Sequence, residues 1–401
     1  MASQISSVNE VWEGLSYQND VIQQVEQLLI KTIEWKVSDI HIEPYGSDQY
    51  RIRLRQDGLL YDLAYVEPAV ANSLVARLKV LSHLDVAEKR LPQDGHFSLK
   101  YASDTLVDFR LSSCPTVDGE KTVVRILNPQ TISKHVEELG FEEAQKQIFI
   151  SALSKPQGLI LFIGPTGSGK TVSMYAALQL LNPAEKNILT IEDPVEINIP
   201  GINQVNINPK VGLTFASGLR AFLRLDPDVM MVGEVRDAQT AQIVIKGSQT
   251  GHLILSTLHA QNTVQVFDRL LNLDLNKMQI QSNLLLLIAQ RLVRKLCDRC
   301  KKPARLSQKV LHQYQLTDQA LIFEPTGCQF CHEGYCGRTG IFELLPITKE
   351  VMKAFSQMNH RPLLEKFLKE NRLSLRDMAV YKASQGVTSL AEIDRVIPEE
   401  F

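Results

Sequence analysis

One short segment, GLILFIGPTGSGKT at residues 158–171, constrains the fold of this chain more than any other. A continuous apolar run is followed by the pattern G-x-x-x-x-G-K-[ST], and a helical pattern begins after it. An apolar run of this length predicts a strand that is buried on both faces of a sheet. Between a strand and a helix, this glycine-rich pattern binds nucleotide phosphates, because backbone N–H groups and the helix N-terminus face the anion.

We therefore predict a loop that binds the phosphates of ATP. Lys170 is expected to contact the β- and γ-phosphates, and Thr171 is expected to ligate Mg²⁺. The loop comprises Gly164, Pro165, Thr166, Gly167, Ser168, Gly169, Lys170 and Thr171.

Strand-like runs recur after this loop and alternate with helical segments. They are NILTIED (187–193), DVMMVGE (228–234) and HLILSTLH (252–259). This alternation predicts an α/β domain with a mostly parallel sheet. We expect helices over 262–294 and a helical tail after the cysteine-bearing insert.

The first part of the chain has a different pattern. Apolar positions at helical spacing occur over 19–36 and near 68–83, and the runs between and after them alternate as strands do. The alternating runs are SDIHIEP, QYRIRLRQDG, TLVDFRLSS and KTVVRILN. We predict a small α+β domain over 1–130, a linker over 131–140 and the α/β domain over 141–401.

Acidic residues follow two of the strand-like runs. A buried strand would deliver Glu234 to the edge of the sheet beside the phosphate-binding loop, to polarise the attacking water or to hold Mg²⁺ through water. TIEDPVE carries Glu192, Asp193 and Glu196, which suit Mg²⁺ and water positioning. The alternatives are a surface acid that caps the next helix for Glu234, and a solvated acidic turn for the other three.

Four of the six cysteines form two CxxC pairs, Cys297/Cys300 and Cys328/Cys331. Four thiolates suit tetrahedral Zn²⁺, and we predict a zinc-binding subdomain over 296–340. Free thiols are the alternative, and His332 is a competing ligand. We interpret Cys114 as a small buried residue and Cys336 as a spare thiol.

Two arginines and two histidines have more than one interpretation from the sequence alone. Arg110 and Arg125 end or follow strand-like runs, and either an arginine that stabilises transition-state charge or an ordinary strand-end arginine fits that position. His252 and His259 flank an apolar strand, as phosphate-sensing groups or as ordinary hydrogen-bonded histidines would.

Composition narrows the class of protein. The formal net charge is −2, which gives no electrostatic case for a dedicated nucleic-acid binder. The N-terminal residues show no secretory signal pattern, and the longest apolar run, LLLLIA at 284–289, is too short to span a bilayer. We therefore expect a cytoplasmic protein that reaches a membrane only peripherally or through a partner.

Together these segments resemble the secretion ATPase superfamily, specifically the assembly ATPases of type II secretion and type IV pili. The resemblance covers roughly residues 20–390. Its most specific pieces are SDIHIEP, RLPQDG, GPTGSGKT, TIEDPVE, LRLDPDVMMVGEVRD, TGHLILSTLH and the tetracysteine insert.

The resemblance implies a PAS-like α+β N-terminal domain and a RecA-like P-loop NTPase domain with a zinc-binding insert. It implies a homo-hexamer that binds ATP and Mg²⁺ between the two domains and holds a structural Zn²⁺. It also implies that Arg110 and Arg125 point at the γ-phosphate, and that His252 and His259 line the nucleotide site and couple phosphate state to domain movement.

The implied function is a Mg²⁺-dependent ATPase motor that drives pilin or pseudopilin assembly, or protein secretion, through an inner-membrane platform protein. The four-cysteine insert favours assembly or secretion over retraction. Full-length members carry an additional N-terminal platform-docking domain to which the resemblance does not extend, and the alternatives are a truncated chain and a natural short form. The competing hypotheses are a DNA-uptake or nucleic-acid motor of the P-loop class, and a scaffold that binds nucleotide without hydrolysing it.

Overall fold

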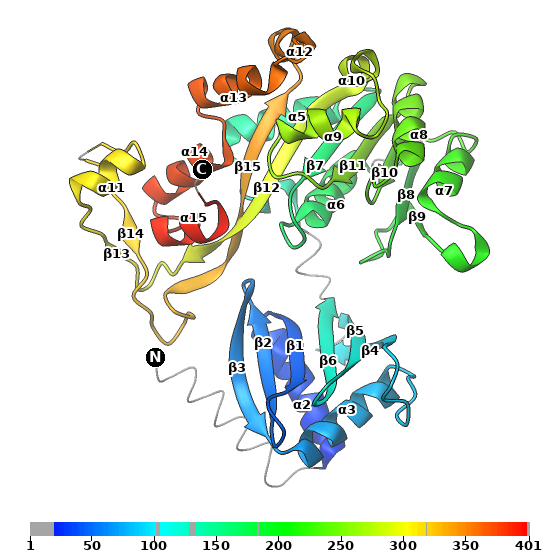
Figure 1. The fold of residues 1–401 in the computed structure, drawn as a ribbon, viewed down its shortest axis with the longest axis vertical. Helices are drawn as coiled ribbons and strands as arrows, with labels where there is room; N and C mark the ends of the chain where they lie inside the picture. The colour runs from blue at the N-terminus through cyan, green and yellow to red at the C-terminus, as the bar shows by residue number, and fades with distance from the viewer. Residues whose placement is uncertain (1–19, 102–104, 128–133, 183, 318, 399–401) are drawn as a thin grey trace. The chain divides into compact units, whose positions relative to one another are not determined.

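The computed structural model of the chain describes residues 20–101, 105–127, 134–182, 184–317 and 319–398. The chain divides into two compact units, which Figure 1 shows as separate sheets with their own helices. The first unit comprises Met1–Ile132 with Gly327–Cys336. The second comprises Ser133–Thr326 with Gly337–Phe401.

The first unit is built on a six-stranded sheet with the order β3-β2-β1-β6-β5-β4, in which every neighbouring pair is antiparallel. The strands are β1 (Val37–Pro44), β2 (Tyr50–Gln56), β3 (Leu59–Val66), β4 (Gln93–Tyr101), β5 (Thr105–Thr116) and β6 (Gly119–Leu127). Alternate residues of β2, β5 and β6 are buried, so the sheet has one apolar and one polar face.

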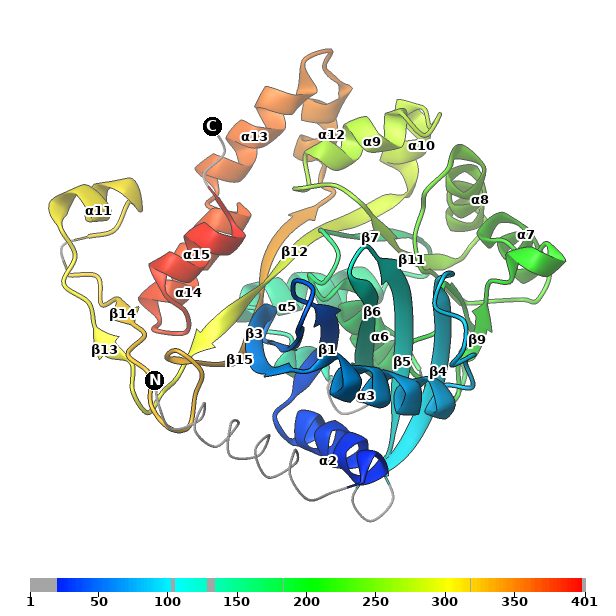
Figure 2. The ribbon, with the colours of Figure 1, turned by 60° about the horizontal axis from the view of Figure 1, so that its bottom comes forward.

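Two helices cover the apolar face of this sheet, α2 (Val21–Glu34) and α3 (Pro68–Leu81), as Figure 2 shows. Leu29 of α2 and Leu74 of α3 share one core with Ile42 and Phe109 of the strands. Strands β3 and β4 do not stand out in the sequence, because most of their residues are only partly buried or exposed and the apolar alternation is weak.

The second unit contains a seven-stranded sheet with the order β15-β12-β7-β11-β10-β8-β9. The pairs from β12 to β9 are parallel, as the alternation of strand-like and helical runs predicts. The strands are β7 (Gly158–Ile163), β8 (Ile188–Glu192), β9 (Asn203–Asn206), β10 (Val229–Val232), β11 (Leu253–Leu258), β12 (Leu284–Leu296) and β15 (Tyr335–Pro346).

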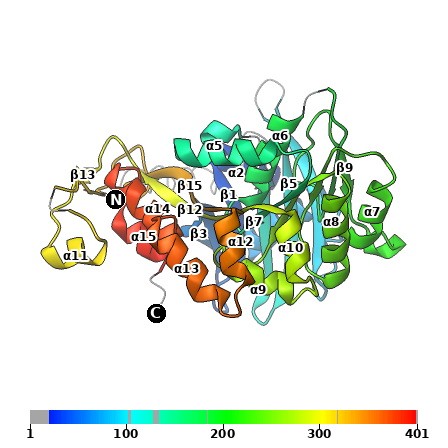
Figure 3. The same cartoon turned by 90° about the horizontal axis from the view of Figure 1, so that it is seen from above.

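Helices lie on both faces of this sheet. Figure 3 shows α5 (Glu143–Leu153) and α6 (Lys170–Leu181) on one side and α8 (Ala238–Gln249), α9 (Gln265–Leu271) and α10 (Lys277–Asn283) on the other. The remaining elements are η1 (Val136–Glu138), η2 (Pro209–Val211), α7 (Phe215–Phe222), β13 (Lys302–Pro303), α11 (Gln308–Gln313), β14 (Phe323–Glu324), α12 (Lys349–Ser356), α13 (His360–Glu370), α14 (Leu375–Ser384) and α15 (Leu390–Val396).

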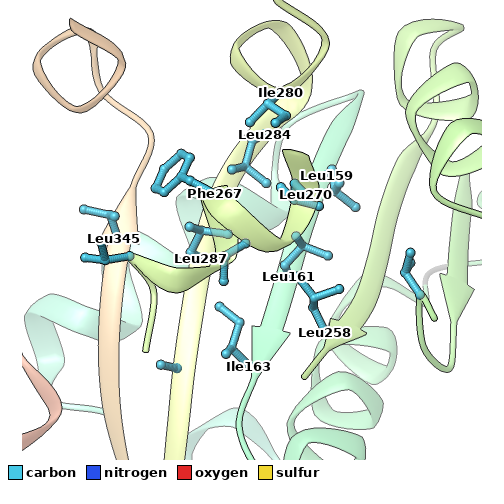
Figure 4. Packing of buried hydrophobic residues seen from close by; sticks show 14 of the residues in the cluster. Leu159, Leu161, Ile163, Leu258, Phe267, Leu270, Ile280, Leu284, Leu287 and Leu345 are labelled. Atoms are coloured by element: carbon cyan, nitrogen blue, oxygen red, sulfur yellow. The ribbon is translucent and has the colours of Figure 1, made fainter. Parts of the chain in front are cut away.

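The central strand β7 is buried along its whole length because both of its faces are covered. Figure 4 shows Leu159, Leu161 and Ile163 in one cluster with Phe267 of α9. Phe162 points to the opposite face and meets Phe149 of α5 edge-on, with ring centroids 6.1 Å apart. Each such leucine or phenylalanine contributes about 1.5–3 kcal/mol relative to an exposed side chain, so β7 is a rigid base for the loop that follows it.

One expectation about local structure is wrong. The run LLLLIAQRLVRKL is the strand β12 and not part of a helix, because it pairs with β7 and is buried on both faces. The described part of the predicted linker belongs to the second unit, where Val136 and Leu139 are buried. Residues 131–133 of that linker lie outside the described residues. Among the described helices, none is both long and apolar enough to cross a membrane.

Candidate active site

Several strands of the second unit end at one edge of its sheet. Because β12, β7, β11, β10 and β8 are parallel, the residues that follow or end them lie along the same edge. Ile163 of β7 is paired with Leu258 of β11 on one side and with Ala289 of β12 on the other. The phosphate-binding loop therefore lies between His259 and Gln290.

The loop has the backbone that the glycine-rich pattern predicts. Gly169 caps α6 with φ 90°, in the left-handed region, and a Cβ at this position would lie only 2.8 Å from the Gln290 side-chain nitrogen. At Gly167, φ is 78° and a Cβ would meet nothing within 4 Å. The loop is therefore supported from below by β12 and open on its outer side, where phosphate oxygens would approach the backbone N–H groups.

Lys170, the first residue of α6, lies against the loop itself. Its Nζ donates hydrogen bonds to the carbonyl oxygens of Gly164, at 2.7 Å, and Pro165, at 3.0 Å. Burial lowers the pKa of Lys170, while the nearby Glu234 carboxylate opposes this shift and Arg291 adds to it. An anion at the loop would favour the charged form of this lysine, as a phosphate ligand requires.

Glu234 lies beyond the end of β10, where the sequence places it. Its carboxylate forms an ion pair with Arg236, and its Oε2 lies 3.5 Å from Nε2 of His259, which follows β11. The side chain is only 14% exposed, and its charge acts on Lys170. A carboxylate, an imidazole and an ammonium group from three separate segments therefore converge beside the phosphate-binding loop.

The three acids of TIEDPVE have different surroundings. Glu192, at the end of β8, is buried and accepts hydrogen bonds from Tyr175 at 2.5 Å, Thr190 at 2.7 Å and Gln204 at 3.2 Å. Burial and the adjacent Glu192 carboxylate raise the pKa of Tyr175 well above its usual value. These hydrogen bonds fix the position of the Glu192 carboxylate, and its predicted contact with Mg²⁺ and water stays a prediction.

Asp193 and Glu196 remain nearer to solvent. Asp193 is exposed and Glu196 is partly buried, with its backbone N–H donating to the Tyr175 hydroxyl at 3.1 Å. The hydrogen bond to Glu234 raises the pKa of Arg236, and the charge of Asp193 adds to this effect. Arg236 therefore links Asp193 electrostatically to Glu234.

The two histidines lie at opposite ends of β11. His259 follows the last residue of the strand, whereas His252 precedes its first residue and faces the other edge of the sheet. Nδ1 of His252 is 2.9 Å from the Gly247 carbonyl oxygen, and its backbone oxygen accepts from Gly158. A strand of this length separates its ends by roughly 20 Å. The structure therefore brings His259, but not His252, to the edge of the sheet that carries the phosphate-binding loop.

The two predicted arginines belong to the first unit. Arg110 and Arg125 lie in the interior of β5 and β6, not at strand ends, and they face each other in the register of the sheet. Arg125 also lies opposite Asp39 of β1, and the Arg125 Nε donates a hydrogen bond to the Asp39 Oδ1 at 3.0 Å. The Arg125 side chain is 59% exposed. Its guanidinium is therefore oriented by a carboxylate while much of it stays open to solvent.

The four predicted cysteine ligands come together. The sulfur atoms of Cys297, Cys300, Cys328 and Cys331 all lie within 4.8 Å of one another. Tetrahedral Zn–S bonds of ~2.3 Å would separate sulfur atoms by about 3.8 Å, so the cluster fits a zinc ion after small adjustments. Cys336 is exposed, and Cys114 is also exposed, contrary to its interpretation as a buried residue.

Sequence reasoning missed Gln290 and Arg291, which lie next to the phosphate-binding loop on β12. The Ser173 hydroxyl of α6 donates to the Gln290 side-chain oxygen at 2.9 Å. Arg291 donates to the backbone oxygens of Gln290, at 3.0 Å, and Gln261, at 2.8 Å. The sequence contains a pattern that could have identified them. Gln290 and Arg291 directly follow the apolar run LLLLIA, just as polar site residues follow the apolar runs of the other strands.

Comparison with known proteins identifies a family. A family model described as "Type II/IV secretion system protein" matches residues 15–395. The type IV pilus assembly ATPase PilB of Acinetobacter baylyi is 48% identical over 388 residues, which cover 94% of this chain and 66% of that protein. The type II secretion system ATPase E of Vibrio cholerae is 42% identical over 382 residues, which cover 94% of this chain and 76% of that protein. This chain thus spans about two thirds to three quarters of the length of these relatives.

Solved structures agree on the fold. The DotB ATPase of Yersinia pseudotuberculosis superposes with a TM-score of 0.69 at 17% identity, over 95% of each chain. The pilus retraction motor PilT with bound ADP superposes with a TM-score of 0.64 at 21% identity, over 95% of this chain and 98% of that chain. The second unit thus has the expected RecA-like α/β fold.

Proposed function

The chain belongs to the type II/IV secretion system protein family, whose curated relatives include named ATPases, and we propose that it hydrolyses ATP as a Mg²⁺-dependent motor. The observation that carries the proposal is the convergence of Lys170, Glu234 and His259 at one edge of the sheet. In this proposal, the γ-phosphate of a bound ATP lies beside these three groups, which come from distant parts of the sequence.

The proposed chemistry assigns one role to each group. The loop Gly164–Thr171 binds the phosphates through its backbone N–H groups, and Lys170 moves from the loop carbonyls to the β- and γ-phosphates. Glu234 orients the attacking water and accepts its proton as the new oxygen–phosphorus bond forms. The bond between the γ-phosphorus and the β–γ bridging oxygen breaks, and ADP and phosphate leave.

His259 is proposed to orient Glu234 and to respond to the γ-phosphate, since its imidazole already lies near that carboxylate. Mg²⁺, held by Thr171 and the phosphates and supported by Asp193 and Glu196, would neutralise charge on the phosphate oxygens. We do not include His252 in this site.

Arg110 and Arg125 are proposed to stabilise charge that develops on the γ-phosphate. Two adjacent guanidinium groups on a solvent-facing sheet suit an anionic ligand. Arginines supplied from a separate domain or subunit accelerate phosphoryl transfer by roughly 10³–10⁵. In this proposal six chains assemble into a ring, and hydrolysis moves the two units of each chain against each other.

The proposed output is work on an inner-membrane platform protein, which drives pilin or pseudopilin assembly or protein secretion. The names of the relatives support this class of output, since they include pilus assembly and type II secretion ATPases. The proposed location is the cytoplasmic side of the inner membrane, with contact through partners. The tetracysteine cluster would hold a structural Zn²⁺.

The test is ATP turnover per chain as a function of protein concentration with Mg²⁺. We expect the rate per chain to rise with concentration as the ring assembles, and to fall at least about 100-fold in Arg110→Ala. The control is Lys31→Ala, which removes an exposed cation of α2 that pairs only with Glu34 among the ion pairs of the described residues. A rate that is independent of concentration, with an active Arg110→Ala variant, would contradict the ring motor.

A further inference from the structure

The short loop after β11, residues 259–263, is held by two charged side chains that the proposed mechanism does not use. At one side, Arg291 of β12 donates from Nη2 to the Gln261 carbonyl oxygen at 2.8 Å. At the other, Glu343 of β15 accepts from the backbone N–H of Thr263 at 2.8 Å and from its hydroxyl at 2.6 Å. We refer to residues 259–263 as the His259 loop.

Each charged group also anchors the loop to a rigid part of the second unit. Arg291 donates from Nη1 to the Gln290 carbonyl oxygen at 3.0 Å, beside the phosphate-binding loop. Glu343 accepts from the backbone N–H of Leu375, the first residue of α14, at 3.0 Å. The His259 loop is thereby fixed between the strand that supports the phosphates and the start of a C-terminal helix.

The burial of these groups argues for a role in geometry. Glu343 is 2% exposed, Thr263 is fully buried and Arg291 is partly buried. Burial lowers the pKa of Arg291, and the charge of Glu343 counteracts this shift. Buried charges cost free energy and often contribute little net stability compared with apolar residues, whereas hydrogen bonds to charged groups are strong and directional.

The position of the His259 loop links this arrangement to the proposed site. His259 lines the same groove as Pro165, Arg291 and Glu343. The His259 Nε2 lies 3.5 Å from the Glu234 Oε2, which is already long for a hydrogen bond. A displacement of about 1 Å in such a constellation can lower a rate roughly 100-fold.

We propose that Arg291 and Glu343 are positioning residues that hold the His259 loop in register with Glu234 and the phosphate-binding loop. The inference rests on the proposed ATPase function, because it assigns these residues to the precision of that site. They orient His259 and the loop backbone without touching the γ-phosphate.

The first test separates turnover from nucleotide binding. We expect Arg291→Met and Thr263→Val to lower kcat by about 10- to 100-fold and about 3- to 10-fold, respectively. The Kd of a fluorescent ADP analogue should stay within about twofold of wild type, because the phosphate-binding loop is intact. Arg291→Lys should have an intermediate kcat, since one ammonium group replaces a guanidinium that makes two bonds.

The second test does not depend on activity. Hydrogen–deuterium exchange should show faster exchange over residues 259–265 in Glu343→Gln, because the Thr263 N–H loses a charged acceptor. The phosphate-binding loop should exchange at the wild-type rate. Unchanged exchange over 259–265 would overturn the role of Glu343.

The matched control is Arg294→Met, three residues further along β12, where the buried arginine pairs with Glu392 of α15. This variant should lose thermal stability but keep its kcat. If Arg291→Met and Thr263→Val keep the wild-type kcat, or if Arg294→Met lowers kcat equally, the positioning role is wrong. If the wild-type chain itself hydrolyses no ATP at any concentration, the proposed function fails, while the exchange experiment still tests the loop.

Discussion

The positions of Glu234, His259 and Lys170 are set by the parallel strands that precede them. Each follows a different parallel strand or the loop after it, and together they surround a position that backbone N–H groups make favourable for an anion. A carboxylate that is mostly buried beside an imidazole and an ammonium group suits proton transfer from water.

Replacing the Glu234 carboxylate should separate hydrolysis from binding. We expect Glu234→Gln to lower kcat by roughly 10²–10⁴ and to leave nucleotide affinity nearly unchanged, since the amide cannot accept the proton from water. Steady-state ATPase assays and fluorescent ADP titrations measure the two quantities. Glu185→Gln, at an exposed position, is the control. Wild-type turnover in Glu234→Gln would remove this residue from the mechanism.

The two histidines should respond differently to truncation. His259→Ala is expected to lower kcat at least about tenfold, because it removes the group next to Glu234. His252→Ala should mainly lower Tm, because it removes the contact between the ring and the Gly247 carbonyl at the opposite edge of the sheet. Measurements of kcat and Tm for both variants show whether each histidine affects turnover or stability. A His252→Ala variant that folds normally but turns over slowly would contradict the separation of the two roles.

At the scale of elements, β12 connects three parts of the second unit. Its first half, from Leu284 to Ala289, pairs with β7, and its end leads into the first CxxC pair. Between these parts, Gln290 contacts Ser173 of α6 and Arg291 contacts Gln261 of the His259 loop. The same strand is fixed to the C-terminal helix α15 through Arg294 and Glu392. Changes at the cysteines or at α15 are therefore expected to lower the stability of the second unit through this strand.

The tetracysteine cluster should bind one zinc ion per chain by elemental analysis. Cys297→Ser and Cys328→Ser should each lower the zinc content and the Tm, since a structural zinc site contributes directly to folding. Cys336→Ser is the matched control, because this exposed cysteine lies outside the cluster. A zinc content near zero after purification without chelator would exclude the metal site.

The contact between β12 and α15 should make stability depend on acid pH. Burial alone raises the pKa of Glu392, but hydrogen bonds from Arg395 and Arg294 outweigh it, so the net pKa lies below the usual 4.5. A lowered carboxyl pKa in the folded state stabilises the fold above pH ~4.5, and this stabilisation is lost as the pH falls through the folded-state pKa.

We therefore expect the difference in free energy of unfolding between wild type and Glu392→Gln to shrink as the pH falls from about 6 to about 3. Urea titrations at several pH values measure this difference. A difference that stays constant or grows on acidification would show that Glu392 is not ionised and paired in the folded protein.

At the scale of the whole molecule, the chain combines a nucleotide site with a polar sheet face on a separate unit. The net charge is −2, so no strong positive field attracts a polyanion such as DNA. We instead expect anion binding to be local, at the phosphate-binding loop and at the Arg110 and Arg125 pair.

Nucleic acid should therefore not be the effector of this motor. We expect single-stranded and double-stranded DNA to change ATP turnover by less than about twofold at moderate salt, where nucleic-acid motors bind through many phosphate contacts. The effect of DNA on ATP turnover is compared with the effect of a cytoplasmic fragment of a membrane platform protein, the proposed partner. Strong stimulation by DNA that declines with salt would favour the DNA-uptake hypothesis.

The sequence by itself determined the features that depend on local chemistry. GPTGSGKT specifies its own backbone through glycines and the helix that follows. The paired CxxC motifs bring thiols together through short turns, and continuous apolar runs such as GLILFI become buried strands. These patterns predicted the α/β unit with its mostly parallel sheet and the two cysteine pairs, because each pattern acts over a few residues.

Only the tertiary structure decided what depends on register and burial. The run LLLLIAQRLVRKL has the apolar character of either a helix or a strand, and pairing with β7 makes it β12. The direction of β11 places His259 at the site and His252 away from it. Glu192 is committed to Tyr175 and its other partners by burial. Contacts between segments far apart in the chain make each of these choices, and one-dimensional spacing contains no information about them.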